Sequence, residues 1–344
     1  MKNNQFHIDF KLNGVSFLSV DELLAYSKSL TVSTHFFLND WFSDASFIEV
    51  NTSGSTGKPK LIQLKKEFMI NSAIATGHFF DLQEKTTALL CMSTDYIAGK
   101  MMLVRALILG WNLDIVEPVS NPLKGIEKKY DFSAMVSLQL QNSLSKIQNI
   151  KKLIVGGGVV SKELDDKIQK VSTEVFATFG MTETITHIAV KKLNHLTEIS
   201  NYKLLPNISI SLDKRNCLVI NAPKISKELI STNDVIELVS EKEFKWLGRF
   251  DNVINSGGIK LHPEKIEEKL SKIIPQRFFV TGIPDLVLGE KLILIIEGDE
   301  MNIDFRNSED LTKYETPKET YFVTKFIETD TKKIQRKETI KLIE

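Results

Sequence analysis

Neither sign of charge dominates this chain of 344 residues, and it has no long apolar run. Its 44 basic and 44 acidic side chains cancel, so the electrostatic footprint of a dedicated nucleic-acid binder is missing. No stretch approaches the ~18 apolar residues of a membrane span, and the first residues, MKNNQFHIDFKLNG, lack the apolar core of a signal peptide. We therefore expect a cytoplasmic protein with small-molecule partners, no nucleic acid and no membrane span.

Cysteine is scarce as well. Cys91 and Cys217 lie far apart in the sequence, in the apolar surroundings LLCMS and RNCLVI. Neither has a neighbouring metal-ligand pattern, which predicts two buried reduced thiols. With 42% hydrophobic residues, a chain of this length can build a large core and more than one domain.

The Walker-type phosphate loop is also absent. In the segment NTSGSTGKPK (51–60), only two residues separate Gly54 from Gly57, and Lys58 is followed by Pro59, which argues against a P-loop NTPase. The same segment still has glycines that let backbone N–H groups converge, together with hydroxyls and lysines that suit a phosphate. Taken alone, it is equally a solvated surface loop.

Short apolar runs alternate with helical patterns from about residue 46 to 185. This alternation predicts a parallel sheet covered by helices, with ligand groups at the carboxyl ends of the strands. Both NTSGSTGKPK and FGMTE follow such runs. After residue 205, the short alternating runs ISISL, CLVINA, DVIELV and FKWLG predict antiparallel strands.

The pattern changes again near Asp251. We expect a helix over 263–274, strands over 277–283 and 291–298, a short helix near 308–314, a strand over 321–327 and a lysine-rich tail. The predicted fold is therefore α/β, with a large N-terminal domain (1–250) of helix-covered sheets and a small β-subdomain. A smaller α+β C-terminal domain (251–344) follows it.

Six motifs follow one another in a fixed order. They are TSGSTGKPK (52–60), GGG (156–158), FGMTE (179–183), STND (231–234), GRFDNVINSGGIKLHPEKIE (248–267) and KKIQR (332–336). The series resembles the acyl-adenylate-forming superfamily, which includes acyl- and aryl-CoA synthetases, firefly luciferase and the adenylation domains of peptide synthetases. The resemblance implies a carboxylate that reacts with ATP and Mg²⁺ to give an acyl-adenylate, followed by attack of a thiol such as coenzyme A.

The same resemblance implies roles for individual residues. The phosphate-binding set is Thr52, Ser53, Gly54, Ser55, Thr56, Gly57, Lys60 and Thr182. The catalytic set is Lys60, Glu183 and Lys333, with Glu183 also holding Mg²⁺. The acyl-adenylate lies on Gly156, Gly157, Gly158, Phe179, Gly180 and Met181, and its ribose on Asp234 and Arg249. Asp251 is the hinge of a mobile C-terminal domain, and Gly257, Gly258 and Lys260 serve the thioester step.

Three positions depart from the family pattern, each where glycine is usual: Leu61, Asn233 and Lys332. Leu61 puts the closing geometry of the phosphate loop in question. We expect Asn233 to preserve a turn, because asparagine tolerates left-handed backbone angles. Lys332 changes the backbone freedom beside Lys333.

The acid-binding region narrows the resemblance. The segments STDYIAGKMMLVRAL and FGMTETITHIAVKKLN, and a phosphate loop that begins already at Thr52, are similar to o-succinylbenzoate-CoA ligases of menaquinone biosynthesis. A dicarboxylate substrate needs apolar walls and donors for the acid that is not activated. The candidate donors are Lys100, Arg105 and His187, and the candidate wall residues are Tyr96, Gly99 and Ile185. Alternatively, Lys100 and Arg105 only solvate a helix, and His187 is a satisfied buried imidazole.

Other functions stay open at this point. The chain is also compatible with a different acyl- or aryl-CoA synthetase, or with a stand-alone enzyme that loads a carrier protein; CoA dependence separates these two. A nucleotide-binding regulator that has lost catalysis is a further alternative, and pyrophosphate release separates it from the enzymes. The presence of Lys60, Glu183, Asp234 and Lys333 argues against the regulator. A homodimer remains open.

Overall fold

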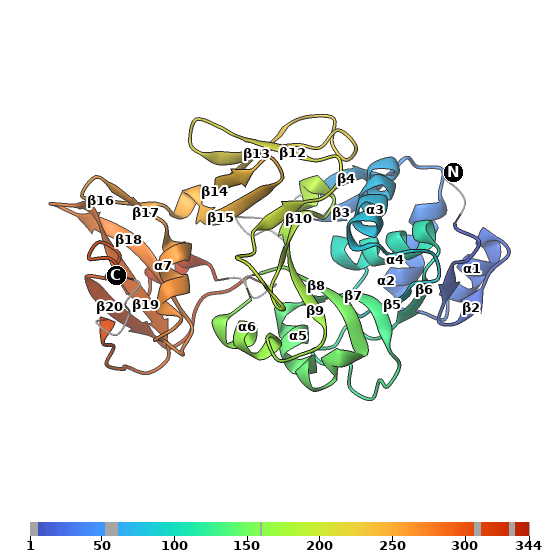
Figure 1. The fold of residues 1–344 in the computed structure, drawn as a ribbon, viewed down its shortest axis with the longest axis horizontal. Coiled ribbons are helices and arrows are strands. Elements are labelled where there is room, and N and C mark those ends of the chain that lie inside the picture. Colours follow the sequence, from blue (N-terminus) through green and yellow to red (C-terminus); the bar gives the residue numbers. More distant parts are fainter. Residues whose placement is uncertain (1–5, 52–60, 159, 306–310, 330–333, 344) are drawn as a thin grey trace.

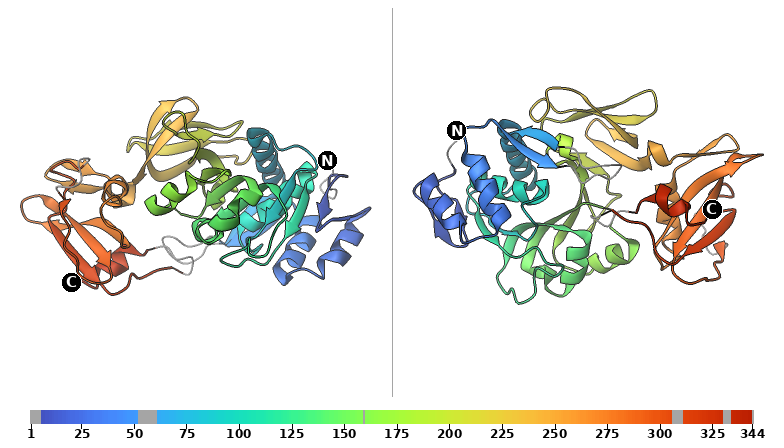
Figure 2. Two further views of the ribbon diagram at one scale, coloured as in Figure 1. Left: turned by 60° about the horizontal axis from the view of Figure 1, so that its bottom comes forward. Right: turned by 180° about the vertical axis from the view of Figure 1, so that it is seen from behind.

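The computed structural model describes residues 6–51, 61–158, 160–305, 311–329 and 334–343. Most strands join one sheet of thirteen strands, and a second sheet of five strands lies at one end of the molecule (Figures 1 and 2). Across these ranges, no helix is both long and apolar enough to cross a membrane. The mixed α/β class predicted from the sequence is confirmed.

The centre of the large sheet is parallel, as predicted. In spatial order its strands are β6 (Asn112–Ile115), β5 (Thr87–Leu90), β7 (Tyr130–Val136), β8 (Ile150–Gly156) and β9 (Glu174–Gly180). β10 (His187–Lys192) pairs antiparallel with β9. The sheet continues with β11 (Tyr202–Leu204), β15 (Glu243–Arg249), β14 (Ile230–Ser240), β13 (Cys217–Asn221) and β12 (Ser209–Leu212), which pair antiparallel as expected.

Helices cover both faces of the parallel strands. The larger core lies between the sheet and the helices α3 (Lys66–Phe80) and α4 (Ile97–Leu109). A second core lies under α5 (Ser137–Ser143), the short 3-10 helix η1 (Leu144–Asn149) and α6 (Lys162–Ile168). Because alternate residues of a strand point to opposite faces, both sides of apolar strands such as β8 are buried.

The N-terminal residues complete the opposite edge of the sheet. β1 (Lys11–Leu12) pairs parallel with β6, and β2 (Val15–Ser16) pairs antiparallel with β1. The helices α1 (Val20–Ser27) and α2 (Val32–Phe42) follow. The side chains of Ser19 and Thr31 accept hydrogen bonds from the first turns of these helices, which satisfies N–H groups that would otherwise be unpaired.

One strand assignment from the sequence needs correction. The apolar run before NTSGSTGKPK does form a strand, β3 (Phe47–Asn51), but β3 is not part of the parallel sheet. It pairs antiparallel with β4 (Leu61–Lys65) as a separate two-stranded sheet. A short apolar run identifies a strand without identifying its partner, and so the segment after β3 does not follow a strand of the parallel sheet.

The five-stranded sheet contains β16 (Ile254–Ser256), β17 (Ile259–Leu261), β18 (Phe278–Asp285), β19 (Gly289–Glu297) and β20 (Glu319–Val323). The helix expected over 263–274 is shorter, α7 (Pro263–Leu270). The expectation of a helix near 308–314 is wrong for its described part, because residues 311–314 form no helix. The tail ends in the short helix α8 (Arg336–Ile340). Residues 308–310 lie outside the described residues.

Contacts between α7 and β15 join the two sheets. Glu264 on α7 lies so close to Gly248 on β15 that a Cβ added to Gly248 would stand 2.2 Å from Oε2 of Glu264. The other oxygen of Glu264 accepts a hydrogen bond from Nδ2 of Asn252. Gly248 has φ +133°, a conformation that favours glycine. The backbone conformation therefore favours glycine at this position, and a Cβ would also force the Glu264 side chain to shift.

Both cysteines are free and buried, which confirms the prediction made from their apolar surroundings. Burial raises the pKa of the Cys91 thiol to about 12. Cys91 is therefore protonated at neutral pH and has no thiolate chemistry to offer.

Candidate active site

The turn after β9 is tightly constrained. A Cβ on Gly180 would stand 2.1 Å from the carbonyl oxygen of Thr186, and so the approach of the two segments requires glycine. The 3-10 helix η2 (Thr182–Thr184) follows, and the Thr184 hydroxyl accepts from the backbone N–H of Met181 at 2.9 Å. Ile185 has φ +66°, which is strained for a β-branched residue. Strain of this kind is frequent at binding sites.

Glu183 lies in η2 and is exposed. In the described part of the chain, no group of three or more His, Cys, Asp or Glu side chains could hold a metal by itself. One accessible carboxylate fits Mg²⁺, because this ion commonly takes one or two carboxylates and completes its shell with phosphate oxygens and water. The turn is therefore compatible with a magnesium ion that arrives with a nucleotide.

A buried guanidinium lies beneath this turn. Arg105 on α4 is 2% exposed. Its Nε donates to Oγ1 of Thr76 at 3.3 Å, and its Nη2 donates to Oγ1 of Thr186 at 3.2 Å. No carboxylate of the described residues forms an ion pair with it. Burial lowers the pKa of Arg105 to about 10, and so the group is still charged at neutral pH without an acidic partner.

His187, the first residue of β10, is buried beside this group. Its Nε2 lies 3.5 Å from Oγ1 of Thr76, which also accepts from Arg105. Burial, and then the charge of Arg105, lower the pKa of His187 well below its ordinary value. The imidazole is therefore neutral at physiological pH and can donate or accept a hydrogen bond without adding charge.

A cavity of about 220 Å³ adjoins His187. Its walls come from α3, the start of β10, the segment between β11 and β12, and the segment that follows β13. Ile74, Ala75, Leu205, Ile208 and Ile225 provide much of its apolar surface. Ser72 also lines it, and the Ser72 hydroxyl lies 3.4 Å from that of Thr186, the partner of Arg105. The cavity is therefore linked to the buried guanidinium through two hydroxyls.

The other acid-pocket candidates lie elsewhere. Nζ of Lys100 donates to the carbonyl oxygen of Thr94 at 2.6 Å and lies over the Phe37 ring at 5.1 Å. Burial lowers the pKa of Lys100. Tyr96 is 56% exposed, whereas a Cβ on Gly99 would meet the backbone of Ser93. Arg105 and His187 thus lie close together, as both contact Thr76. Lys100 contacts Thr94 and Phe37 instead.

Asp234 in the middle of β14 and Arg249 at the end of β15 form a second site. They face each other in the antiparallel register. The Trp246 indole N–H donates to Oδ1 of Asp234 at 2.9 Å, and Nη1 of Arg249 lies 3.6 Å from Oδ2. Burial raises the pKa of Asp234, and the Trp246 hydrogen bond and the Arg249 charge oppose this effect.

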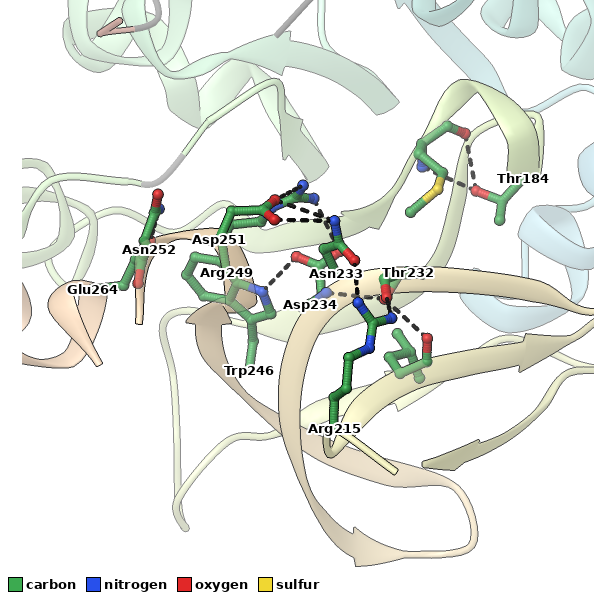
Figure 3. Close-up of polar contacts among 12 residues, drawn as sticks. Thr184, Arg215, Thr232, Asn233, Asp234, Trp246, Arg249, Asp251, Asn252 and Glu264 are labelled. Atoms are coloured by element: carbon green, nitrogen blue, oxygen red, sulfur yellow. Dashed lines mark hydrogen bonds and ion pairs between the residues drawn. The ribbon is translucent and has the colours of Figure 1, made fainter. Parts of the chain in front are cut away.

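Asp251 extends this site in the 3-10 helix η3 (Phe250–Asn252). Nη2 of Arg249 donates to Oδ2 of Asp251 at 3.0 Å, and Nδ2 of Asn233 lies 3.2 Å from both carboxylate oxygens (Figure 3). The turn expected at Asn233 is wrong, because Asn233 lies inside β14 and has no positive φ. Its side chain, rather than its backbone angle, links two elements.

The two glycine segments differ in their constraints. Gly156 ends β8, and a Cβ there would stand 2.7 Å from Oγ1 of Thr178, whereas Gly158 has open space around it. Gly257 and Gly258 form the turn between β16 and β17, with φ +58° and +82°. Exposed Lys260 follows this turn. The Phe179 ring packs on Phe244 at 5.2 Å.

The loop Thr52–Lys60 and Lys333 lie outside the described residues, as does Lys332. Leu61, the departure at the end of that loop, is exposed and starts β4 opposite Asn51. Beyond Lys333, Arg336 forms an ion pair with Glu267 at 2.8 Å and donates to the carbonyl oxygen of Val280 at 3.0 Å. Arg336, three residues past Lys333, is therefore fixed to α7 and β18.

Sequence reasoning missed several partners. Thr76 and Thr186 hold Arg105, Trp246 holds Asp234, and Arg215 reaches Asn233. Only Trp246 carried a usable signal, because it lies on the same strand, β15, as the predicted Arg249. The role of Arg215 depends on a turn between two strands and leaves no periodic trace.

Comparison with known proteins fits this geometry. Residues 50–221 match the family of AMP-binding enzymes. A 2-succinylbenzoate--CoA ligase from Bacillus cytotoxicus is 25% identical over 337 residues, which covers 86% of this chain and 70% of the relative. The protein of the same name from a Geobacillus species is 26% identical over 345 residues, covering 88% and 70%.

Two solved structures are similar along most of the chain. An acyl-CoA synthetase (AMP-forming)/AMP-acid ligase II-like protein from Dyadobacter fermentans is 34% identical with a TM-score of 0.64, covering 94% of this chain and 98% of that chain. The o-succinylbenzoate coenzyme A synthetase from Bacillus subtilis, in complex with ATP and magnesium ion, has a TM-score of 0.74 at 18% identity, covering 94% and 82%. At that identity, the likeness concerns the fold.

Proposed function

Because the chain belongs to the family of AMP-binding enzymes, we propose that it is an acid-CoA ligase that converts o-succinylbenzoate, ATP and coenzyme A to o-succinylbenzoyl-CoA, AMP and pyrophosphate. The product serves menaquinone biosynthesis, and a cytoplasmic location is part of the proposal. The names of the ligases to which the chain is similar support this choice of acid.

The observation that carries the choice is the buried charge of Arg105. Placing a guanidinium away from water without a counter-ion costs several kcal/mol unless a partner compensates it. Among the described residues, the partners of Arg105 are the hydroxyls of Thr76 and Thr186. A second carboxylate on the substrate would supply the missing negative charge, and a monocarboxylate whose only acid is activated would not.

The surroundings of Arg105 suit the rest of such an acid. His187 is neutral and borders a cavity with apolar walls of Ile74 and Leu205. A neutral imidazole can hydrogen-bond a keto group without repelling the guanidinium. The apolar walls can cover hydrocarbon. We assign the ring and keto group of the substrate to this cavity beside His187.

The nucleotide occupies the second site in this proposal. The Asp234 carboxylate accepts hydrogen bonds from the ribose hydroxyls, and Arg249 donates beside it. When bound, Mg²⁺ would neutralise phosphate charge while the carboxylate of the acid attacks the α-phosphorus and pyrophosphate leaves. Glu183 would be its protein ligand, and the segment Thr52–Lys60 would hold the outer phosphates. Lys333 would bridge the acid and the α-phosphate.

The acid assignment is tested with a substrate panel. Pyrophosphate release and CoA consumption are measured with o-succinylbenzoate, benzoate and a medium-chain fatty acid, with ATP and Mg²⁺ present. We expect kcat/KM for the dicarboxylate to exceed the others by more than about 100-fold. Equal rates with all three acids would refute the choice of acid, and absent pyrophosphate release with every acid would refute the enzyme.

The two-domain mechanism needs a separate test. We propose that residues 251–344 rotate about Asp251 between the two half-reactions, so that the turn with Gly257 and Gly258 replaces Lys333 at the site. Lys333→Ala should then abolish adenylate formation and preserve thioester formation from a supplied acyl-adenylate. Equal losses in both half-reactions would contradict this division.

A further inference from the structure

Arg215 connects three elements near the proposed nucleotide site. It lies in the turn between β12 and β13, where its Nε donates to Oδ2 of Asp213 at 2.9 Å. Its two terminal nitrogens donate to β14, to Oδ1 of Asn233 at 2.9 Å and to the carbonyl oxygen of Thr232 at 3.1 Å. Its guanidinium also lies over the Phe250 ring at 5.2 Å. All of these contacts use the planar fork that arginine provides.

Asn233 contacts both Arg215 and Asp251, and so it links the turn between β12 and β13 to the residues that follow β15. Its amide oxygen accepts from Arg215, which orients its Nδ2 toward Asp251. There Nδ2 lies 3.2 Å from both carboxylate oxygens. Asp251 in turn accepts from Arg249 at 3.0 Å, and this guanidinium is 3.6 Å from Asp234. Figure 3 shows the resulting chain of contacts from Arg215 to Arg249.

We propose that Arg215 and Asn233 are positioning residues for the nucleotide: by fixing Asp251, they hold the guanidinium of Arg249 away from the carboxylate of Asp234. This inference rests on the proposed function, in which the ribose binds between Asp234 and Arg249. Arg215 lies outside the six sequence motifs, and Asn233 belongs to the motif STND, where it stands beside Asp234.

The physical reason is competition for one carboxylate. Two parallel hydrogen bonds between arginine and a carboxylate are stronger than one charged contact at 3.6 Å. If Asp251 were released, Arg249 could close on Asp234 and occupy the oxygens that the ribose hydroxyls need. Asp251 prevents this closure by giving Arg249 a nearer partner, and Asn233 keeps Asp251 in reach.

The inference is tested by measuring the affinity of the whole protein for ATP. Calorimetry without acid or CoA gives this affinity. Arg215→Ala and Asn233→Ala should each weaken ATP binding about tenfold, and the double variant should be no weaker than the single ones because the two residues act in one chain. Arg215→Lys keeps the charge beside Asp213 but loses the fork, and should not restore binding. Lys214→Ala removes a charge from the same exposed turn and should bind as the unaltered protein does.

A kinetic split separates positioning from a general loss of structure. KM for ATP should rise about tenfold in both single variants, while kcat and KM for the acid stay within about twofold. ATP affinities that match the unaltered protein would overturn the inference, as would losses that follow the fraction of unfolded protein. If the unaltered protein itself binds no ATP, the proposed function fails instead.

Discussion

Arg105 and Arg249 are two guanidinium groups held in opposite ways. Arg105 is 2% exposed, and its partners among the described residues are threonine hydroxyls. The Arg249 side chain is 35% exposed and lies beside the carboxylates of Asp234 and Asp251. The first group has an uncompensated charge in a dry place, which favours an anionic ligand. The second is already balanced, and so its site suits neutral hydroxyls.

The strongest way to break this comparison is to remove the uncompensated charge. Arg105→Leu should lower kcat/KM for the dicarboxylate on the order of 10³-fold, because the anion loses its counter-ion. The same change should raise the free energy of unfolding by about 1 kcal/mol, since an apolar side chain replaces a buried charge. Activity assays and urea unfolding measure the two effects. Parallel losses of activity and stability would show that Arg105 is a structural group.

A second change disturbs the link between the turn and Arg105. Gly180→Ala would push its new methyl group against the Thr186 carbonyl and displace the hydroxyl that Arg105 uses. We expect kcat to fall about 10²-fold, because misplacement of about 1 Å has effects of that size. Steady-state kinetics with both substrates provide the measurement. Unchanged kcat would mean that the close approach of Gly180 has no part in the reaction.

At the site of Asp234 and Arg249, we expect ATP binding to depend on pH. Trp246→Phe removes the hydrogen bond that lowers the pKa of Asp234 and leaves burial, which raises it. Asp234 must be ionised to accept from two hydroxyls, and so ATP binding weakens as the pH falls through its pKa. In the variant this weakening should begin at higher pH, with KM for ATP about fivefold higher near neutrality. Profiles of KM against pH that coincide would exclude a role for ionised Asp234.

The smallest effect should come from an ion pair remote from both arginines. Lys192 donates to Glu174 at 2.7 Å, and both side chains are about one-third exposed. This hydrogen bond lowers the pKa of Glu174, so its stabilisation is present above the unfolded-state pKa and lost as pH falls through the folded-state pKa. Glu174→Gln should reduce stability by about 0.5 kcal/mol or less. Thermal melting measures the change in stability. A change in KM for ATP or for the acid would contradict the prediction that this ion pair is remote from both sites.

The sequence predicted best those structural features that depend on the residues of a single segment. Apolar runs predicted the parallel strands β5 to β9, because burial on both faces requires them. The partner of β3 is β4, the next strand in the chain, and it was missed because a short apolar run does not identify its partner. Lys100 and Arg105 were expected in one pocket, yet five helical positions differ by about 140° around the axis. That spacing alone argues against a shared pocket. Arg215 acts through the register of three strands, which no single segment encodes.

The attachment of Arg336 to α7 has a consequence for protein engineering. The residue pairs with Glu267 and the Val280 carbonyl, so this end of the Lys333 segment stays with the five-stranded sheet wherever that sheet goes. Grafting residues 253–344 onto a related enzyme would therefore transfer the segment together with its anchorage. The recipient would need a glycine at the position of Gly248, because the backbone there has φ +133°. A single position on the acceptor thus sets a compatibility rule for exchanging this part of the chain.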